Sequence, residues 1–240
     1  NKNICFPLRN TDFELRRDGS YYHQQKPQFD VKVSLITRTI PGRSYHLKNA
    51  MYSVLNQTHA NIEWIISQDG GPKIKLSDLG LPDSIRPKVK LIRHEKSGRS
   101  KAGNAGLAAC SGRWVKWLDD DDWLYADDIE TLLNADTSAS IRYGTAWTIP
   151  SAQQSNGHIF EQLPYVAGGL YPDELDADAL ADCNRVPIQA PLFLKKLATP
   201  LREDLEFLED WAFWRDLVIR ETGVRIDKTL SGYRIPLDQR

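Results

Sequence analysis

The sequence predicts an α/β fold with a doubly wound, mostly parallel sheet flanked by helices, followed by a smaller mixed region. Short β-branched segments alternate with helical segments over residues 31–135, and the strands run into turn or polar residues. Parallel neighbouring strands need long connections, and such crossovers are right-handed. The alternation therefore favours a parallel sheet with helices on its faces.

Four strands are expected in this first part. The segment VKVSLIT (31–37) is β-branched and is followed by a Pro-Gly turn, which is typical of a buried strand. The other three are IEWIIS (62–67), KVKLI (88–92) and WVKWL (114–118). A helix from about 100 to 110 is rich in Ala and Gly, which suits close packing on a sheet. An earlier helix has one apolar face, formed by Leu47, Ala50, Met51, Val54 and Leu55.

The second part of the chain is less regular. A strand is expected at 141–149, and residues 150–190 form a loose stretch punctuated by Pro and Gly. A last helix is expected from Glu209 to Glu221, with Gly223 placed to cap it. The segments VRID and GYRIP are expected to close the chain as two short strands.

Length and charge indicate one domain preceded by an arm. A chain of 240 residues can bury a substantial core. We expect residues 1–30 to be an arm or linker and 31–240 to be a single domain with halves 31–135 and 136–240. With 31 basic and 32 acidic residues the net charge is -1, so nucleic acid is not an expected partner.

Cysteine usage and hydropathy favour a reducing compartment. The three cysteines, Cys5, Cys110 and Cys183, show no C-x-x-C spacing, which argues against a disulfide framework or a zinc site. No apolar stretch approaches the roughly 20 residues that span a bilayer, so no transmembrane segment is expected in this chain. The sequence begins with Asn1, as a fragment would. We expect a cytoplasmic location, or a peripheral one at the inner face of the membrane.

Four consecutive aspartates follow the fourth strand, at 119–122. Like charges this close repel one another unless a cation or solvent compensates them. Ligands of doubly wound sheets bind at the carboxyl ends of strands, where Thr37, Asp69 and Asp119 are all expected. Hard oxygen ligands suit Mg²⁺ or Mn²⁺, which predicts a metal site; a solvated loop or a cap for a helix near Asp127 is the alternative.

Four ordered blocks resemble the inverting glycosyltransferase family 2, with its GT-A fold, over roughly residues 31–235. They are VSLITRT, a helix ending SVLNQT, IEWIISQDGG, and GNAGLAACSGRWVKWLDDDDWL. The resemblance implies transfer of a hexosyl or hexosaminyl group from a nucleotide-diphosphate donor, with a UDP-sugar favoured, to a hydroxyl of a saccharide or lipid-linked saccharide. It further implies a nucleotide-sugar half at 31–135, an acceptor half at 136–240, and a role in surface polysaccharide or glycoconjugate synthesis.

Donor-side residues are carried over onto the matching positions. By resemblance, Asp69 holds the nucleotide base and the D-x-D element touches ribose and metal, with Asp121 and Asp119 as metal ligands. Cations are also expected near the diphosphate, although the family's frequent Arg-Asn pair is Gly103 and Asn104 here. The remaining expected donor-binding residues are Thr37, Arg38, Arg99, Lys101, Asp119 and Asp120.

The acceptor side carries an acidic pair at the start of the last helix. By resemblance, Asp210 is the general base and Glu209 is its structural or acceptor-binding partner; a plain helix N-terminus is the alternative. Adjacent helical residues point about 100° apart, so only one of the two is expected to face the cleft. The helix N-terminus is expected to favour the ionised carboxylate and thereby lower its basicity.

Three other functions fit the sequence less well. A sugar-phosphate nucleotidylyltransferase needs a Gly-rich phosphate loop after the first strand, and TRTIPGR is not such a loop. A phosphatase with a nucleophilic Asp would place its D-x-D after an early strand. A non-catalytic divalent-metal or carbohydrate-binding module would also use clustered Asp, but Leu124 stands where a calcium loop has Gly.

Overall fold

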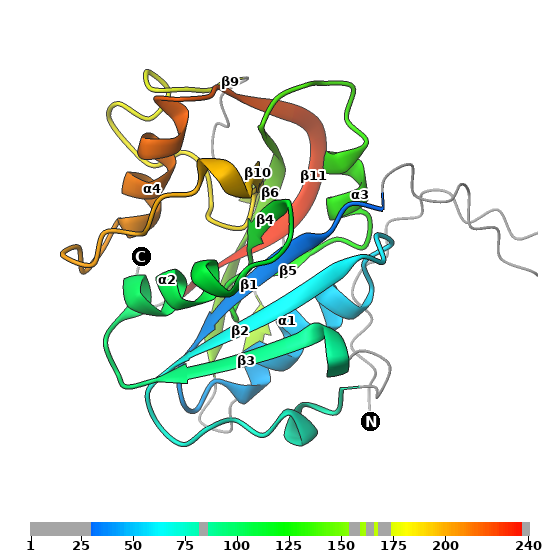
Figure 1. Cartoon of the computed structure of the whole chain (residues 1–240), viewed down its shortest axis with the longest axis vertical. Coiled ribbons are helices and arrows are strands. Elements are labelled where there is room, and N and C mark those ends of the chain that lie inside the picture. Colours follow the sequence, from blue (N-terminus) through cyan, green and yellow to red (C-terminus); the bar gives the residue numbers. More distant parts are fainter. Residues whose placement is uncertain (1–29, 82–85, 154–158, 162–165, 168–173, 237–240) are drawn as a thin grey trace, which may run out of the picture.

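The computed structural model describes residues 30–81, 86–153, 159–161, 166–167 and 174–236. The expected arm, 1–30, lies outside these residues except for Asp30. The described strands form one sheet with the order β3-β2-β1-β4-β10-β6-β11-β5 (Figure 1).

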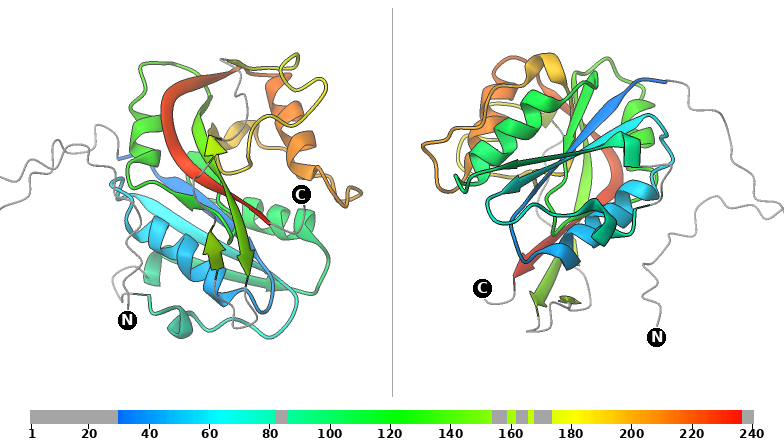
Figure 2. Two further views of the ribbon diagram at one scale, coloured as in Figure 1. Left: turned by 180° about the vertical axis from the view of Figure 1, so that it is seen from behind. Right: turned by 60° about the horizontal axis from the view of Figure 1, so that its bottom comes forward.

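The first half of the sheet is parallel, as predicted. The strands β1, β2, β3 and β4 pair side by side in the same direction, with the helices α1 and α2 as crossovers. Figure 2 shows these two helices on opposite faces of the sheet. The bounds are β1 (Val33–Thr39), α1 (Ser44–Leu55), β2 (Ile62–Asp69), β3 (Val89–His94), α2 (Arg99–Ala109) and β4 (Trp114–Trp117).

Alternation along β1 explains the two layers. Leu35 belongs to the apolar core beneath α1, whereas its neighbour Ile36 belongs to the core on the α2 side. Successive side chains of a strand point to opposite faces, so a run of apolar residues buries both. Gly106 lets α2 approach closely, because a Cβ there would lie 2.5 Å from Cγ2 of Ile36. The small-residue helix thus packs on the sheet as the sequence indicates.

The second half is mixed in direction. The strand β10 runs antiparallel to both β4 and β6, while β11 runs parallel to β6. The strand β5 pairs antiparallel with the outer side of β11, and the short β9 pairs with its beginning. The bounds are β5 (Trp123–Leu124), β6 (Ile141–Gln153), β9 (Glu174–Leu175), β10 (Pro191–Leu194) and β11 (Gly223–Pro236).

Two predicted boundaries in this half are wrong. The segments VRID and GYRIP form one long strand, β11, because register shifts near Thr229 bend the strand instead of ending it. The helix α4 (Glu209–Val218) stops before Glu221. Its last turn tightens, with the N–H of Arg220 donating to the carbonyl of Leu217, and Gly223 begins β11 instead of capping the helix.

Short elements complete the described chain. They include α3, close to the helix that the sequence suggests near Asp127. No described helix is long and apolar enough to cross a membrane. The bounds are η1 (Leu76–Leu79), η2 (Arg86–Lys88), α3 (Asp128–Leu133), β7 (Ile159–Glu161), β8 (Val166–Ala167) and η3 (Lys195–Leu197). Both β7 and β8 pair with β6, so the stretch expected to be irregular contains strands.

An aromatic cluster fixes α4 against the sheet. Phe213 packs edge-to-face on Trp117 of β4, with 5.7 Å between ring centroids, and Trp214 packs in the same way on Phe193 of β10 at 5.6 Å. Both helix residues are buried. Each such pair contributes about 0.5–1.5 kcal/mol beyond its area burial. The start of α4 is therefore held in a fixed position relative to the end of β4.

A buried ion pair connects β4, which precedes the aspartate run, to α3, which follows it. Nζ of Lys116, on β4, lies 3.1 Å from Oδ2 of Asp128, at the start of α3, and both side chains are fully buried. The same Nζ donates to the carbonyl of Ala190 at 2.9 Å. Removing one member of a buried pair leaves the other charge without compensation.

We therefore expect Lys116→Met to lower the free energy of unfolding by about 3–5 kcal/mol, as measured by urea denaturation. The matched control is the double variant Lys116→Met/Asp128→Leu, which removes both charges. It should be more stable than the single variant, and a double variant as unstable as the single one would show that the uncompensated Asp128 is not the cause.

Candidate active site

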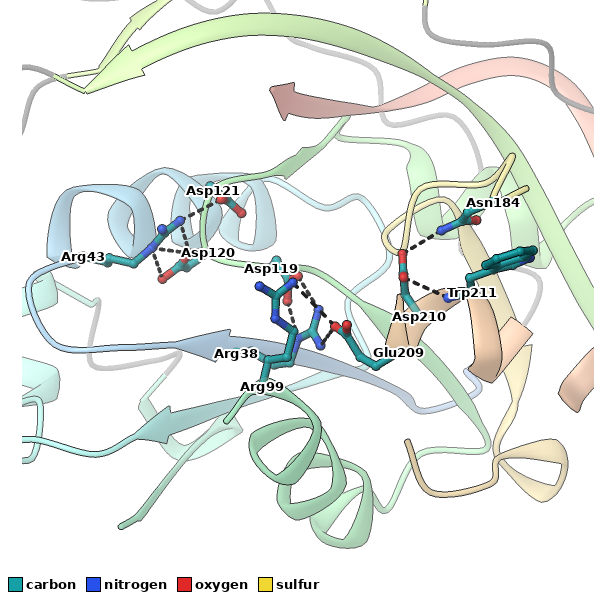
Figure 3. Close-up of polar contacts among 10 residues, drawn as sticks. All are labelled: Arg38, Arg43, Arg99, Asp119, Asp120, Asp121, Asn184, Glu209, Asp210 and Trp211. Carbon is teal, nitrogen blue, oxygen red and sulfur yellow. Dashed lines mark hydrogen bonds and ion pairs between the residues drawn. The ribbon is translucent and has the colours of Figure 1, made fainter. Parts of the chain in front are cut away.

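An open cleft lies where β1, β2 and β4 end, at the edge of the sheet that the sequence indicates. It is bordered by the loop after β1, the start of α2 and the aspartate run after β4. Its lining residues are Arg38, Thr39, Ile40, Arg43, Asp69, Arg99, Ala102, Asp119, Asp120 and Asp121. Figure 3 shows that the first residues of α4, Glu209 and Asp210, lie beside this group.

Asp119 comes directly after the last buried residues of β4 and meets Arg38 from the end of β1. The contact is bidentate: Nε and Nη2 of Arg38 donate to the two carboxylate oxygens at 2.8 and 2.5 Å. The fork of a guanidinium matches a carboxylate in this geometry. Asp119 keeps 23% of its side chain exposed, so it remains open to the cleft while Arg38 compensates its charge.

Arg43 compensates the next two aspartates. Its Nε donates to Asp120 at 2.9 Å and its Nη2 donates to Asp121 at 2.7 Å. Asp120 also accepts from the hydroxyl of Thr39 at 2.6 Å. Burial raises the pKa of Asp120 to about 7, despite the lowering effect of Arg43. Arg43 was not singled out in the sequence, where only its place after the Pro-Gly turn distinguishes it.

The fourth aspartate turns inward. Asp122 is buried, and it accepts the backbone N–H of Arg234, on β11, at 3.0 Å. Burial raises its pKa, and the neighbouring Asp121 adds to the increase. The Arg234 guanidinium lies over the ring of Trp123, 4.4 Å from the centroid, and Nη1 donates to the carbonyl of Asp121. Asp122 therefore ties the turn to β11, and the other three aspartates line the cleft.

Asp69 holds the loop between β3 and α2. Its two carboxylate oxygens accept the backbone N–H groups of Ser97 and Gly98 at 2.7 and 3.0 Å. Gly98 has φ +96, a left-handed conformation that favours glycine. Arg99 follows at once and lines the cleft with 54% of its side chain exposed.

Two expected donor-binding residues are not brought to the cleft. Thr37 is fully buried and accepts a hydrogen bond from the indole N–H of Trp64 at 2.8 Å. Its neighbour Arg38 faces the cleft, and alternation along the strand turns Thr37 to the opposite face of the sheet. Lys101 is exposed on α2 and is not among the residues that line the cleft.

The acidic pair of α4 separates into two environments. Glu209 is buried, accepts from Nη1 of Arg38 at 2.7 Å, and lies 3.9 Å from Nη1 of Arg99. Asp210 is half-buried and accepts from the side-chain amide of Asn184 and from the N–H of Trp211, both at 2.8 Å. Asn184 lies in the stretch expected to be irregular, where no sequence signal marked it.

The pKa of Asp210 moves opposite to the sequence-based expectation. Burial and the nearby charge of Glu209 raise it, outweighing the backbone N–H of Trp211 and the charge of Arg38, which lower it. The helix N-terminus is therefore not the dominant influence. A raised pKa makes the carboxylate a stronger proton acceptor.

Sequence relatives of this chain are glycosyltransferases. The model of the glycosyl transferase family 2 matches residues 44–146, which include α1, α2 and the whole aspartate run. The chain is 23% identical to the glycosyltransferase GlyA of Streptococcus pneumoniae over 86% of this chain and 31% of that protein. It is 30% identical to the putative glycosyltransferase EpsH of Bacillus subtilis, over 85% of this chain and 61% of EpsH.

The chain is thus similar to glycosyltransferase family 2, through residues 44–146 and through its curated relatives. Its resemblance to that family, inferred from the ordered sequence blocks, is thereby confirmed. The chain spans about a third of the length of the first curated relatives, 31–38% of each. A further relative is the chondroitin synthase of Escherichia coli, 28% identical over 55% of this chain and 19% of that enzyme.

Solved structures confirm the GT-A fold. Staphylococcus aureus TarS, residues 1–349 in complex with UDP, superposes with a TM-score of 0.64 at 16% identity, covering 85% of this chain and 60% of that one. The TarS complex with UDP-GlcNAc superposes with a TM-score of 0.61, covering 85% and 58%. At this identity the similarity establishes the fold alone.

The three cleft aspartates suit a divalent cation that shares its coordination with a ligand. Among the described residues, no three His, Cys, Asp or Glu side chains are already arranged as a metal site. Mg²⁺ usually takes only one or two protein carboxylates, and phosphate oxygens and water fill its other positions. Asp121, with 37% of its side chain exposed, and Asp119 are the two open carboxylates. GT-A glycosyltransferases commonly use a divalent metal.

We expect Mn²⁺ binding to the cleft to tighten as the pH rises from 6 to 8. The pKa of Asp120 is about 7, so in the folded state this carboxyl loses its proton within that window. Ionised Asp120 adds a negative charge beside the proposed ligands Asp119 and Asp121, so a bound metal competes with its proton. Below the pKa, affinity should change by up to about tenfold per pH unit if one proton is released.

Electron paramagnetic resonance of Mn²⁺ with the nucleotide-free chain measures this affinity. Asp136→Asn, at an exposed position outside the cleft, is the control and should reproduce the wild-type pH dependence. An Mn²⁺ affinity that stays constant from pH 6 to 8 would show that the ionisation of Asp120 does not affect metal binding.

Proposed function

We propose that this chain is the catalytic domain of an inverting glycosyltransferase that transfers a hexosyl or hexosaminyl group from a UDP-sugar to a saccharide hydroxyl. The observation that carries the proposal is the juxtaposition of the aspartate run with the acidic pair of α4. Arg38 contacts both, through Asp119 and Glu209. Arg38 thus holds the proposed donor-binding aspartates close to the end of α4 that carries the proposed base.

The comparisons favour this donor and acceptor class. TarS was solved with UDP and with UDP-GlcNAc, and the relatives include a chondroitin synthase and a putative teichuronic acid biosynthesis glycosyltransferase. We extend this to a free or lipid-linked saccharide acceptor in surface polysaccharide or glycoconjugate synthesis. A cytoplasmic location, or one at the inner face of the membrane, would give access to such substrates.

On the donor side, the roles follow from position. Asp69 and the loop that it holds would bind the nucleotide base. Asp119 and Asp120 would contact the ribose. Arg43 and Arg99 line the cleft with partly exposed guanidinium groups, so they are suited to a diphosphate. They supply the cations that the family's Arg-Asn pair would otherwise bring. Thr37 would have no direct contact with the donor, because its side chain is buried on the opposite face of the sheet and bound to Trp64.

The metal site would consist of Asp121 and Asp119, with Mn²⁺ or Mg²⁺ as the ion. Such a cation, when bound, neutralises charge on the diphosphate leaving group. Arg43 now donates to Asp121, so this arginine would have to release that carboxylate as a metal and diphosphate bind. A released guanidinium would then be free to contact phosphate oxygens.

On the acceptor side, Asp210 would be the general base. It accepts the proton of the acceptor hydroxyl while that oxygen forms a bond to the anomeric carbon. The bond from this carbon to the diphosphate oxygen breaks on the opposite face, so configuration is inverted and the nucleoside diphosphate leaves. Asn184 orients the Asp210 carboxylate. The raised pKa of Asp210 favours transfer of the proton to this carboxylate.

Asp210→Asn should lower kcat for transfer by about 10²–10⁴-fold, because the amide cannot accept the proton. The measurement is release of UDP with an acceptor saccharide, and calorimetric UDP binding should stay within about threefold of wild type because Asp210 is not among the residues that line the proposed donor cleft. The matched control is Asp216→Asn on the exposed side of the same helix. Transfer at the wild-type rate would remove Asp210 from this role.

Asp121→Asn should abolish the increase in thermal stability that Mn²⁺ and UDP together give the wild-type chain. A ligand that binds only the folded state stabilises by about 2.7 kcal/mol at a hundred times its Kd, so loss of the metal ligand is visible as a lost shift in Tm. UDP without metal should give the same small shift in both proteins. An unchanged shift with Mn²⁺ would contradict the metal assignment.

A further inference from the structure

The buried guanidinium of Arg38 joins the two sides of the cleft, and we infer that it is a positioning residue that couples the aspartate run to the base-bearing end of α4. The inference rests on the proposed function. In this inference Arg38 acts through protein contacts, not by binding the donor itself as the sequence suggests, since each of its three guanidinium nitrogens donates to Asp119 or Glu209.

Each of the three guanidinium nitrogens of Arg38 donates to a protein carboxylate. Nε and Nη2 bind the two oxygens of Asp119, and Nη1 binds Oε1 of Glu209 at 2.7 Å (Figure 3). Asp119 follows β4 and Glu209 begins α4, 90 positions later by their residue numbers. The guanidinium is thus a three-point connection between segments far apart in the chain.

Packing leaves Arg38 little freedom to move. Its side chain is 9% exposed, and its guanidinium carbon lies 5.9 Å from the centroid of the Trp117 ring. On the α2 side, a Cβ added at Gly103 would lie 3.5 Å from Cδ of Arg38, an ordinary van der Waals distance, so the helix packs directly against this side chain. Rotamers fixed in this way hold a site within the narrow tolerances that catalysis needs.

Charge makes the connection necessary. Glu209 is 2% exposed, and a buried carboxylate without a partner is costly. Arg99 lies 3.9 Å away and is more than half exposed, so Arg38 is the closer and better shielded partner. A lysine would keep the charge but not the planar fork, so it could not bind Asp119 in bidentate fashion and Glu209 together.

The position of Glu209 determines that of Asp210, the next residue. The preceding residue, Leu208, has φ 62, a left-handed conformation that is strained for a leucine. Such strain persists only where surrounding contacts hold it, and the Arg38–Glu209 pair is one such contact. A donor or metal that draws Asp119 toward the cleft would therefore act on the base through Arg38.

The test separates transfer from donor binding in Arg38→Lys and Arg38→Met. We expect kcat for transfer to fall by about 10²-fold, the order of loss that a misplacement of about 1 Å produces, while the calorimetric Kd for UDP with Mn²⁺ changes by less than about fivefold. Transfer at the wild-type kcat, or equal losses in UDP binding and transfer, would overturn the inference.

A double-variant cycle tests the coupling itself. If Arg38 acts through Glu209, then Arg38→Met/Glu209→Met should lose no more than about threefold in kcat beyond Arg38→Met, because coupled residues are not additive. Losses that multiply would overturn the coupling. A wild-type chain without transfer activity would instead contradict the proposed function, so the two failures are distinguishable.

Arg142 provides the matched control for loss of a buried arginine. It is 8% exposed and, within the described part of the chain, donates to the backbone carbonyls of Leu132, Leu133, Thr137 and Ala139, none of which lines the cleft. Arg142→Lys should lower thermal stability and leave kcat within about twofold of wild type. If Arg142→Lys lowered kcat as much as Arg38→Lys, the effect would be one of general stability, and the inference would fail.

Discussion

Compensation of negative charge at the end of β4 is the constraint on which the site depends. Three carboxylates line one cleft, and at such separations they would repel one another strongly if left alone. Two arginines from the end of β1 and the loop after it supply the opposite charge. Parallel pairing of β1 with β4 is what brings these arginines to the aspartates. The crossover through α2, which leads from β3 to β4 beside β1, thereby builds the site.

The two arginines differ in a way that suits different tasks. Arg38 has 9% of its side chain exposed and joins two protein carboxylates, whereas Arg43 has 29% exposed at the open side of the aspartate run. A guanidinium with solvent access can exchange one anionic partner for another at low cost, but a buried one cannot. Arg38 and its two carboxylate partners therefore belong to the framework of the cleft. Under the proposed function, a metal and a diphosphate would enter beside Arg43.

The less regular half of the chain brings α4 to the cleft through packing more than through a sequence motif. Phe213 and Trp214 dock α4 on β4 and β10, and this docking carries Glu209 and Asp210 to the cleft. Asn184 then contacts Asp210 from a segment with little regular structure. Placement by a rigid aromatic cluster, with a polar contact from a loop, is a common way to hold a catalytic group.

The α/β class, the parallel first half and the candidate site can be predicted from the sequence, because periodicity, turn residues and a run of aspartates after a strand are local signals. Which side chains meet depends on the tertiary structure. It turned Thr37 beneath the sheet and Asp122 toward β11, and it paired Arg38 with residues 81 and 171 positions away. It also joined two expected strands into β11, since bulges depend on a neighbouring strand. Contacts between distant segments, and the pKa values that burial sets, have no local signature in a single chain.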